Sequence, residues 1–360
     1  MNITSEKLFS LSVSGLGNNN YCPIQAGCEV DFLSWYRIRR FGELKITIKY
    51  FNRIFSTGCG VREEKGPAFT VVSAYIGHDE KPSAEAKNEV RLSFGGKPET
   101  TVVDGYESDP AEVSVPEGEW LSVRLRVRAD ADCALLSTDE SCTGGYRDGA
   151  FSLNVLRPNF IGCEGDFRET LLFFGDSITQ GSQTRPDEYE AWSHRIAMAV
   201  PADISVINNG VGWSRAYDAA ADGIFLKLAR RGTTVTICFG VNDIKSAGRT
   251  GAEVIADLRR TIELLKKDKP ELKVILFTVP PFNLDPWGEE QRQIVNREIL
   301  SGGLCERVFD FASVLEDSEA GRVRPEYMCG PDDAHPNGMA GEAAAKALLA
   351  GGLLEAGGGI

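Results

Sequence analysis

The chain has 360 residues, nine cysteines and a formal net charge of −13 at pH 7. This length suits two domains, and the acidic charge argues against nucleic acid or an anionic membrane as a partner. No apolar run of about 18 residues predicts a membrane span. The N-terminus lacks the basic and apolar regions of a signal peptide, and the cysteines lack metal-site spacing. We therefore expect a cytoplasmic protein with reduced thiols, no metal and no cofactor.

The first part of the chain alternates apolar and polar residues with period two. The clearest such segments are residues 44–50, 69–76 and 120–127. Short strands separated by turn-rich stretches are typical of an all-β sandwich or jelly roll. We predict this domain for residues 1–160. Residues 157–166 contain Pro, Gly and Asn and are interpreted as a linker to a second domain, residues 168–356.

Beyond the linker, strand-like and helix-like segments alternate. The strand candidates are residues 171–175, 204–208, 234–240, 273–279 and 306–311. The helix candidates are residues 188–200, 214–231, 251–268, 286–301 and 337–350. This alternation predicts a parallel five-stranded sheet covered by helices on both faces, which is a three-layer α/β domain.

Four polar blocks follow or end strand-like segments in the second domain, or lie near its C-terminus. They are GDS at 175–177, NNGVGWS at 208–214, GVND at 240–243 and DDAH at 332–335. The carboxyl edge of a parallel sheet is where α/β proteins usually bind ligands. Taken alone, Ser177 is more simply a helix cap, because serine often caps helices. The other three blocks change that interpretation.

A serine hydroxyl becomes a useful nucleophile only beside a base, and histidine titrates near neutral pH. The chain has three histidines. His78 lies in a polar, turn-like stretch, and His194 lies in a predicted helix, where surface or packing roles suit it. His335 is the candidate base. Asp332, three residues upstream, is the expected partner of its imidazole, and Asp333 is the competing one.

The four blocks, in this order and at these separations, resemble the SGNH (GDSL) hydrolase superfamily of esterases and acylhydrolases over about residues 170–350. The resemblance implies flavodoxin-like strand order and a catalytic set of Ser177, Asp332 and His335. It also implies three donors to an oxyanion: the Ser177 backbone N–H, the Asn242 side chain and a backbone N–H in the second block. Gly212 is the favoured third donor, and Trp213 competes because it stands where the family has glycine.

Asn208 and Asp243 are interpreted as loop-bracing and helix-capping residues. Trp192, Trp213 and Trp287 are candidates for the wall of an acyl pocket or for stacking on sugars, although core packing is at least as good an interpretation of Trp192.

The expected function is hydrolysis of small acyl esters, acetyl esters above all, on carbohydrates, through an acyl-enzyme on Ser177. An N-terminal sandwich joined to such a hydrolase resembles some bacterial carbohydrate esterases. The runner-up is a lipid or thioester acylhydrolase. A protein of a different class, a glycan- or protein-binding module with a non-catalytic hydrolase fold, is the third hypothesis. The sequence leaves the oligomeric state open.

Overall fold

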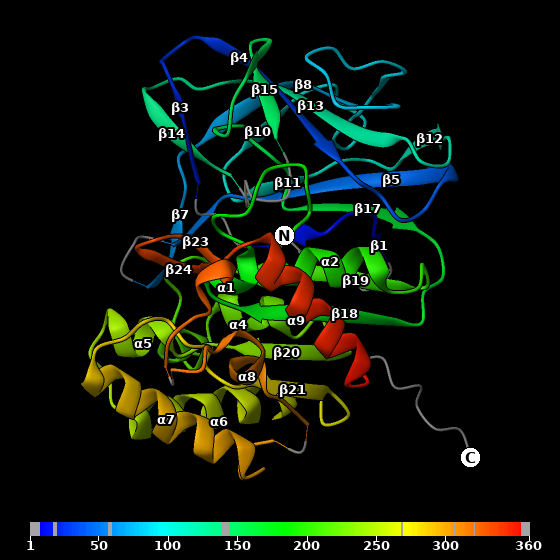
Figure 1. Cartoon of the computed structure of the whole chain (residues 1–360). Coiled ribbons are helices and arrows are strands. Elements are labelled where there is room, and N and C mark those ends of the chain that lie inside the picture. Colours follow the sequence, from blue (N-terminus) through cyan, green and yellow to red (C-terminus); the bar gives the residue numbers. More distant parts are fainter. Residues whose placement is uncertain are drawn as a thin grey trace.

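The computed structural model describes residues 8–16, 20–56, 60–137, 144–267, 269–305, 307–319 and 321–353. Figure 1 shows a strand-rich part, mostly blue to green, stacked on an α/β part coloured green to red. The predicted fold class is confirmed in both parts.

Two antiparallel sheets form the sandwich. One contains β1 (Leu8–Ser10), β17 (Phe160–Glu164), β5 (Gly42–Phe51), β11 (Gly105–Glu107) and β12 (Ala111–Val115). The other contains β10 (Thr100–Val102), β8 (Phe69–Asp79), β9 (Val90–Arg91), β13 (Trp120–Arg128), β4 (Glu29–Tyr36), β15 (Gly145–Arg147) and β16 (Ala150–Phe151). Two further two-stranded antiparallel sheets accompany them: β3 (Asn20–Ile24) with β14 (Cys133–Ser137), and β6 (Arg53–Ser56) with β7 (Val61–Lys65).

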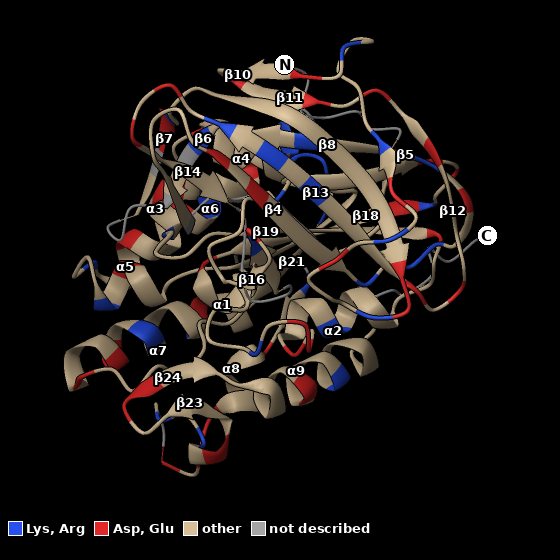
Figure 2. Cartoon of the chain, turned by 90° about the horizontal axis from the view of Figure 1, so that it is seen from above, with Lys and Arg blue, Asp and Glu red and all other residues tan. Residues whose placement is uncertain are grey.

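Period-two alternation explains why these segments form a sandwich. Apolar residues of both sheets, such as Ile48 of β5 and Val123 of β13, are buried in one shared core. Residues between them point outward and carry charge. Arg126 on β13, for example, pairs with Glu29 on β4 at 2.9 Å. Figure 2 shows such basic and acidic positions side by side on β13 and β4.

The second part contains a parallel sheet. Its strands are β18 (Glu169–Gly175), β19 (Ile204–Gly210), β20 (Thr234–Cys238), β21 (Lys273–Phe277) and β22 (Val308–Phe309). Their spatial order is β19-β18-β20-β21-β22, the flavodoxin-like order implied by the resemblance. The sequence did not predict a sixth strand, β2 (Ser14–Gly15), which pairs parallel to β19.

Helices cover both faces of this sheet. They are α1 (Ser177–Gln180), α2 (Trp192–Ala199), α3 (Ala216–Ala219), α4 (Ile224–Ala229), α5 (Val241–Lys245), α6 (Gly251–Lys267), α7 (Pro286–Leu300), α8 (Phe311–Leu315) and α9 (Gly338–Ala350), with a 3-10 turn η1 (Pro325–Tyr327). The two faces are distinguished by consecutive residues of β18, since side chains alternate along a strand. Phe173 contacts Trp192 of α2, whereas Phe174 contacts Phe225 of α4.

The predicted single helix over 214–231 is wrong, because the structure has α3 and α4 there. Asp222 adopts a positive φ of 54° between them. Gly223 follows as the N-cap of α4, and a side chain there would collide with the carboxylate of Glu63. That carboxylate accepts the N–H of Phe225 at 2.8 Å, so a sandwich residue caps this helix.

The two parts share more than a linker. The segment predicted as linker contains β17, which pairs with β1 and β5 of the sandwich. Asn159, just before it, is buried and donates to the carbonyl of Leu16 while accepting the N–H of Phe51. We propose that the domain boundary lies after Glu164 rather than at residue 160. The N-terminal strand β2 then belongs to the sheet of the second domain.

In the part of the chain that the structure describes, no helix is long and apolar enough to cross a membrane. The seven cysteines within that part are all free thiols.

Candidate active site

Ser177 stands where β18 ends. Asp176 caps the following turn by accepting the N–H of Ile178 at 2.9 Å, and Ser177 is the first residue of α1. The helix lies against β19 because residue 210 is glycine: a Cβ there would lie 2.3 Å from the backbone nitrogen of Gln180. The serine is thus presented at the carboxyl edge of the sheet, half-buried.

The structure brings Ser177 and His335 together across 158 residues of chain. Ser177 Oγ lies 3.0 Å from His335 Nε2, and His335 Nδ1 lies 2.6 Å from Asp333 Oδ1. An ionised carboxylate can only accept hydrogen bonds, so Nδ1 carries the proton and donates it to Asp333. In the neutral imidazole Nε2 is then the acceptor of the Ser177 hydroxyl. This chain of contacts has the geometry of a Ser-His-Asp triad.

The predicted contact between Asp332 and the imidazole is not formed in the structure, where Asp333 contacts His335 instead. Asp333 and His335 both belong to β24 (Asp333–Pro336), which pairs with β23 (Met328–Gly330). Residues two apart on a strand project to the same face, whereas Asp332 precedes the strand and is exposed. Asp333 also accepts the backbone N–H of His335 at 3.1 Å. The imidazole of His335 is therefore contacted by Asp333, the alternative partner named in the sequence analysis.

Two residues that sequence analysis did not single out, Phe282 and Lys245, lie next to this pair. Burial raises the pKa of Asp333, but the bonds from His335 and the nearby charge of Lys245 outweigh it, and the pKa lies below its ordinary value. Phe282 meets the imidazole edge-on, with ring centroids 5.1 Å apart, and Lys245 lies over the Phe282 ring. Figure 1 shows the orange β23–β24 hairpin beside α1.

The second block forms a tight turn behind the nucleophile. Ser214 N–H donates to the carbonyl of Val211, and both Val211 N–H and Ser214 Oγ donate to the carbonyl of Gly175. Gly212 is buried, and its N–H has no acceptor among the residues that the structure describes. A buried N–H without an acceptor is uncommon and suits a preorganised oxyanion donor.

Trp213 occupies the third position of this turn with φ of 68°, a conformation that normally favours glycine. For a residue with a Cβ this left-handed conformation costs about 1–2 kcal/mol. Its side chain is 49% exposed, so burial does not offset that cost fully. Strain of this kind concentrates at functional sites.

The third block is tied to the second. Asn242 Nδ2 donates to the carbonyl of Ser214 at 3.1 Å, which uses one of its two N–H groups. Asp243 accepts the N–H groups of Ala216 and Tyr217 at the start of α3. Because Ser214 is itself bonded to Gly175, the Asn242 amide is held near the start of α1, with one N–H left for an oxyanion. Asn208 accepts the N–H of Gly210 and donates to Thr179, which is the bracing role predicted for it.

Two buried carboxyl groups lie beneath the site. Burial raises the pKa of Asp176 to about 7, and the neighbouring Asp243 adds to the rise. Burial also raises the pKa of Asp243 to about 6, although the two N–H groups it accepts oppose the shift. Neither group contacts Ser177 Oγ through a hydrogen bond among the described residues, so both are placed to cap helices.

The other two histidines make their contacts elsewhere in the chain. His78 lies on β8 and contacts Glu119 at 2.6 Å in the sandwich. His194 is buried in α2, which lowers its pKa to about 3. Trp192 is 2% exposed and belongs to the core, which was the packing role considered for it from the sequence. Trp287, at the start of α7, is 42% exposed. Within the described residues no group of three His, Cys, Asp or Glu is arranged to hold a metal ion.

A model of the GDSL-like lipase/acylhydrolase family matches residues 173–341. This segment of the chain is similar to that family. The matched segment runs from within β18 to the start of α9, includes Ser177, Asn242 and His335, and is a carboxylic ester hydrolase domain. No curated protein matches the chain significantly.

Three solved structures are similar to the chain. A family two carbohydrate esterase from Clostridium thermocellum in complex with cellohexaose is 12% identical, with 95% of this chain and 97% of that chain covered and a TM-score of 0.40. A salicylyl-acyltransferase from a tetracycline biosynthetic pathway is 16% identical, with 91% and 83% covered and a TM-score of 0.43. A catalytic mutant of an acetylxylan esterase from Geobacillus stearothermophilus is 23% identical, with 52% and 95% covered and a TM-score of 0.40.

Proposed function

We propose that this chain is a serine esterase that hydrolyses small acyl esters, acetyl esters of carbohydrates above all, through an acyl-enzyme on Ser177. The observation that carries the proposal is the chain of contacts from Ser177 Oγ to His335 and on to Asp333. A serine aligned with a base whose other nitrogen is fixed by a carboxylate is an activated nucleophile.

In the first half of the reaction, Ser177 Oγ attacks the acyl carbonyl carbon and its proton passes to Nε2 of His335. Asp333 holds the imidazole in the required tautomer and stabilises its positive charge. The oxyanion receives hydrogen bonds from the N–H of Ser177, the N–H of Gly212 and the free N–H of Asn242. The bond from the carbonyl carbon to the alcohol oxygen then breaks, and His335 gives its proton to the departing alcohol.

In the second half, a water molecule attacks the ester carbonyl of acylated Ser177. His335 Nε2 takes the water's proton, and the same three donors receive the second oxyanion. The bond to Ser177 Oγ breaks, the proton returns to that oxygen, and the carboxylic acid leaves. No cofactor or metal enters the proposed cycle.

Two exposed aromatic side chains favour a carbohydrate substrate, one on the oxyanion turn and one on α3, which follows it. Trp213 is 49% exposed and Tyr217 is 52% exposed, with Arg215 and Arg249 stacked on the Tyr217 ring. Exposed aromatic faces next to polar groups are suited to sugar rings, which have an apolar C–H face and a polar rim.

The proposal is tested with 4-nitrophenyl acetate, butyrate and octanoate, followed by acetylated sugars. We expect turnover that is highest for acetate and lost in Ser177→Ala. Ser182→Ala, in the same segment, is the matched control and should keep full activity. Melting temperatures of both variants should stay near that of the parent protein, because the Ser177 hydroxyl is hydrogen-bonded to His335 alone among the described residues.

Two outcomes would contradict the proposal. Turnover retained by a clean preparation of Ser177→Ala would remove Ser177 as the nucleophile. A preference for octanoate over acetate would favour the lipid acylhydrolase, and turnover of none of these esters would favour the binding module.

A further inference from the structure

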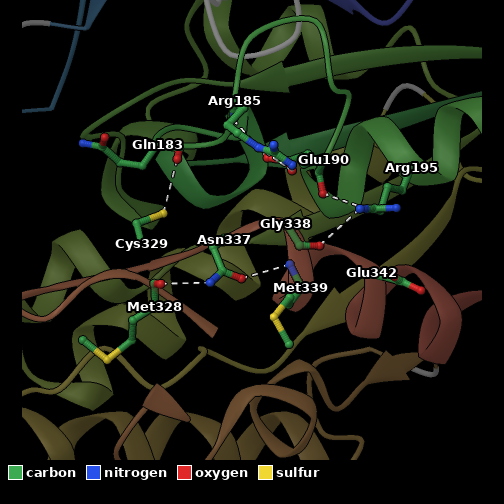
Figure 3. A pocket seen from close by; sticks show the side chains of 10 residues that line it. All are labelled: Gln183, Arg185, Glu190, Arg195, Met328, Cys329, Asn337, Gly338, Met339 and Glu342. Carbon is green, nitrogen blue, oxygen red and sulfur yellow. Dashed lines mark hydrogen bonds and ion pairs between the residues drawn. The ribbon is translucent and has the colours of Figure 1, made fainter. Parts of the chain in front are cut away.

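A pocket of about 440 Å³ lies beside the hairpin that carries His335. Its walls come from the loop after α1, from β23 and from the start of α9. Figure 3 shows Arg185, Glu190 and Arg195 along one side, with Met328 and Met339 opposite them. This volume falls within the range of small-molecule sites, about 300–1,000 Å³.

The pocket is built from chain next to the base. Cys329 lies on β23, the strand paired with the one that carries His335, and its Sγ donates to the carbonyl of Gln183 at 3.3 Å. Asn337, two residues after His335, forms another part of the wall. The loops that carry Gly212 and Asn242 contribute no lining residue among those described.

This position has a chemical consequence. In ester hydrolysis the carbonyl oxygen turns toward the oxyanion donors, and the leaving alcohol must lie within reach of the protonated base. The alcohol therefore departs on the side of His335, away from the turn that holds Gly212. The pocket borders the His335 hairpin, and its lining residues lie next to the base rather than around Ser177.

The charges in the pocket are balanced. The guanidinium of Arg185 is paired with the carboxylate of Glu190, whose side chain is 10% exposed. Arg195 donates to the carbonyls of Glu190 and Gly338 and lies near the carboxylate of Glu342. The residues that line the pocket thus carry no net charge, and the Glu342 carboxylate also pairs with Lys346.

Hydrogen-bonding capacity is nevertheless left over. Arg185 uses Nε and one terminal nitrogen on Glu190, and Arg195 uses Nε and one terminal nitrogen on carbonyls. The second terminal nitrogen of each has no acceptor among the described residues. The thioether of Met339, a residue 58% exposed, adds an adaptable apolar surface.

We infer that this pocket binds the alcohol part of the ester, and that it selects a neutral, hydroxyl-rich alcohol of sugar size over a fatty or charged one. Sugar hydroxyls accept from the free guanidinium nitrogens, and a ring C–H face lies on the methionine side. The inference rests on the esterase activity proposed for Ser177. It assigns Arg185 and Met339 to recognition of the alcohol and leaves acyl-group selection to the other side of the site.

The test compares two substrates that give the same acetyl-enzyme: a monoacetylated glucose and 4-nitrophenyl acetate. Because deacylation is then identical, any change in the ratio of their kcat/KM values reports on the alcohol part alone. We expect Arg185→Ala to lower that ratio about 10- to 100-fold, the effect of losing a hydrogen bond to a charged group. Met339→Ala should lower it less.

Arg259→Ala is the matched control, because Arg259 also forms a partly exposed pair with a glutamate, Glu298, but lies on α6. Its ratio should equal that of the parent. A third substrate, an acetate ester of glucose 6-phosphate, tests whether the pocket prefers an uncharged alcohol. The parent should have a higher kcat/KM for the monoacetylated glucose than for this phosphorylated ester. Thermal unfolding of each variant shows that the comparison is made on folded protein.

The inference is overturned if Arg185→Ala and Met339→Ala keep the parent's ratio, if both substrates lose activity equally, or if the phosphorylated sugar is preferred. These results differ from failure of the esterase proposal. In that case the parent protein itself hydrolyses neither ester.

Discussion

Asp333 and His335 lie two residues apart on one face of β24, and their side chains meet at 2.6 Å between Oδ1 and Nδ1. The same carboxylate also accepts the backbone N–H of His335. Carboxylate, imidazole and strand thus form one local unit, and pairing of β24 with β23 holds that unit beside Ser177. The orientation of the base is fixed within a few residues of chain.

Asp333→Asn should therefore reduce kcat/KM by about 10²- to 10⁴-fold with little change in shape, because the amide favours the wrong imidazole tautomer and lacks the charge that stabilises the imidazolium. Asp332→Asn, at the adjacent residue, is the control, and its kcat/KM should stay close to the parent value. Ester kinetics on the two variants show which carboxylate, Asp333 or Asp332, supports His335. A larger loss in Asp332→Asn would restore the assignment made from the sequence.

His335→Ala should be as severe as loss of the nucleophile, because no other base contacts Ser177 Oγ among the described residues. His194→Asn should leave kcat close to the parent value, since His194 is buried in α2, behind the sheet edge. Steady-state kinetics with 4-nitrophenyl acetate check both. Inactivity of His194→Asn in a folded preparation would contradict the assignment of the base.

His194 should instead affect how stability depends on pH. Burial lowers its folded pKa to about 3, against about 6.5 when unfolded. Between these values the unfolded chain binds the extra proton, so the contribution of His194 is fully present above about pH 6.5 and is lost as pH falls. The stability of the parent relative to His194→Asn should drop from pH 7 to pH 4 in urea unfolding. A pH-independent difference would mean that the histidine is not held neutral.

Asn242→Ala should lower kcat by about 10²- to 10³-fold with a smaller change in KM, because one amide N–H is free for the oxyanion. It should also lower the melting temperature, since the other N–H braces Ser214. Asn296→Ala is the control: that buried amide braces Val279 and should lower stability while kcat is retained. An unchanged kcat in Asn242→Ala would remove it from the oxyanion donors.

Trp213 should prove to be strained. At φ of 68° a Cβ is disfavoured, so Trp213→Gly should be more stable than Trp213→Ala by about 1 kcal/mol, despite the greater flexibility of glycine when unfolded. Chemical unfolding of the two variants measures the difference. Equal stabilities, or a more stable alanine variant, would show that the turn relaxes once the indole is gone.

The sequence predicted the five hydrolase strands, most of which are buried apolar runs, whereas their order came from the family resemblance and not from the strand pattern. It did not predict β2, since a two-residue strand has no periodicity to detect. It also took β17 for a linker, because Pro158, Asn159 and Gly162 resemble loop residues. In the structure Asn159 is buried, and its amide bridges Phe51 and Leu16. That role depends on tertiary contacts.

At the site, Ser177, Asn242 and His335 were found because each stands in a short motif that ends a strand or lies near the C-terminus. Asp333 was ranked second because the motif spacing outweighed the alternation of a short strand. Arg185 and Glu190 carried no motif at all. Their position beside the β23–β24 hairpin depends on the folding of the loop after α1 onto that hairpin, a tertiary contact with no sequence pattern.

The measurement that tests the central claim most directly is covalent labelling with a 4-nitrophenyl alkylphosphonate, followed by mass spectrometry of the peptides. Reaction requires a nucleophile activated by its neighbours, so no ester substrate has to be guessed. We predict a single adduct, on Ser177, formed by the folded protein, greatly slowed in His335→Ala and absent after denaturation. An adduct on another residue, no adduct with folded protein, or equal rates with and without His335 would contradict the account.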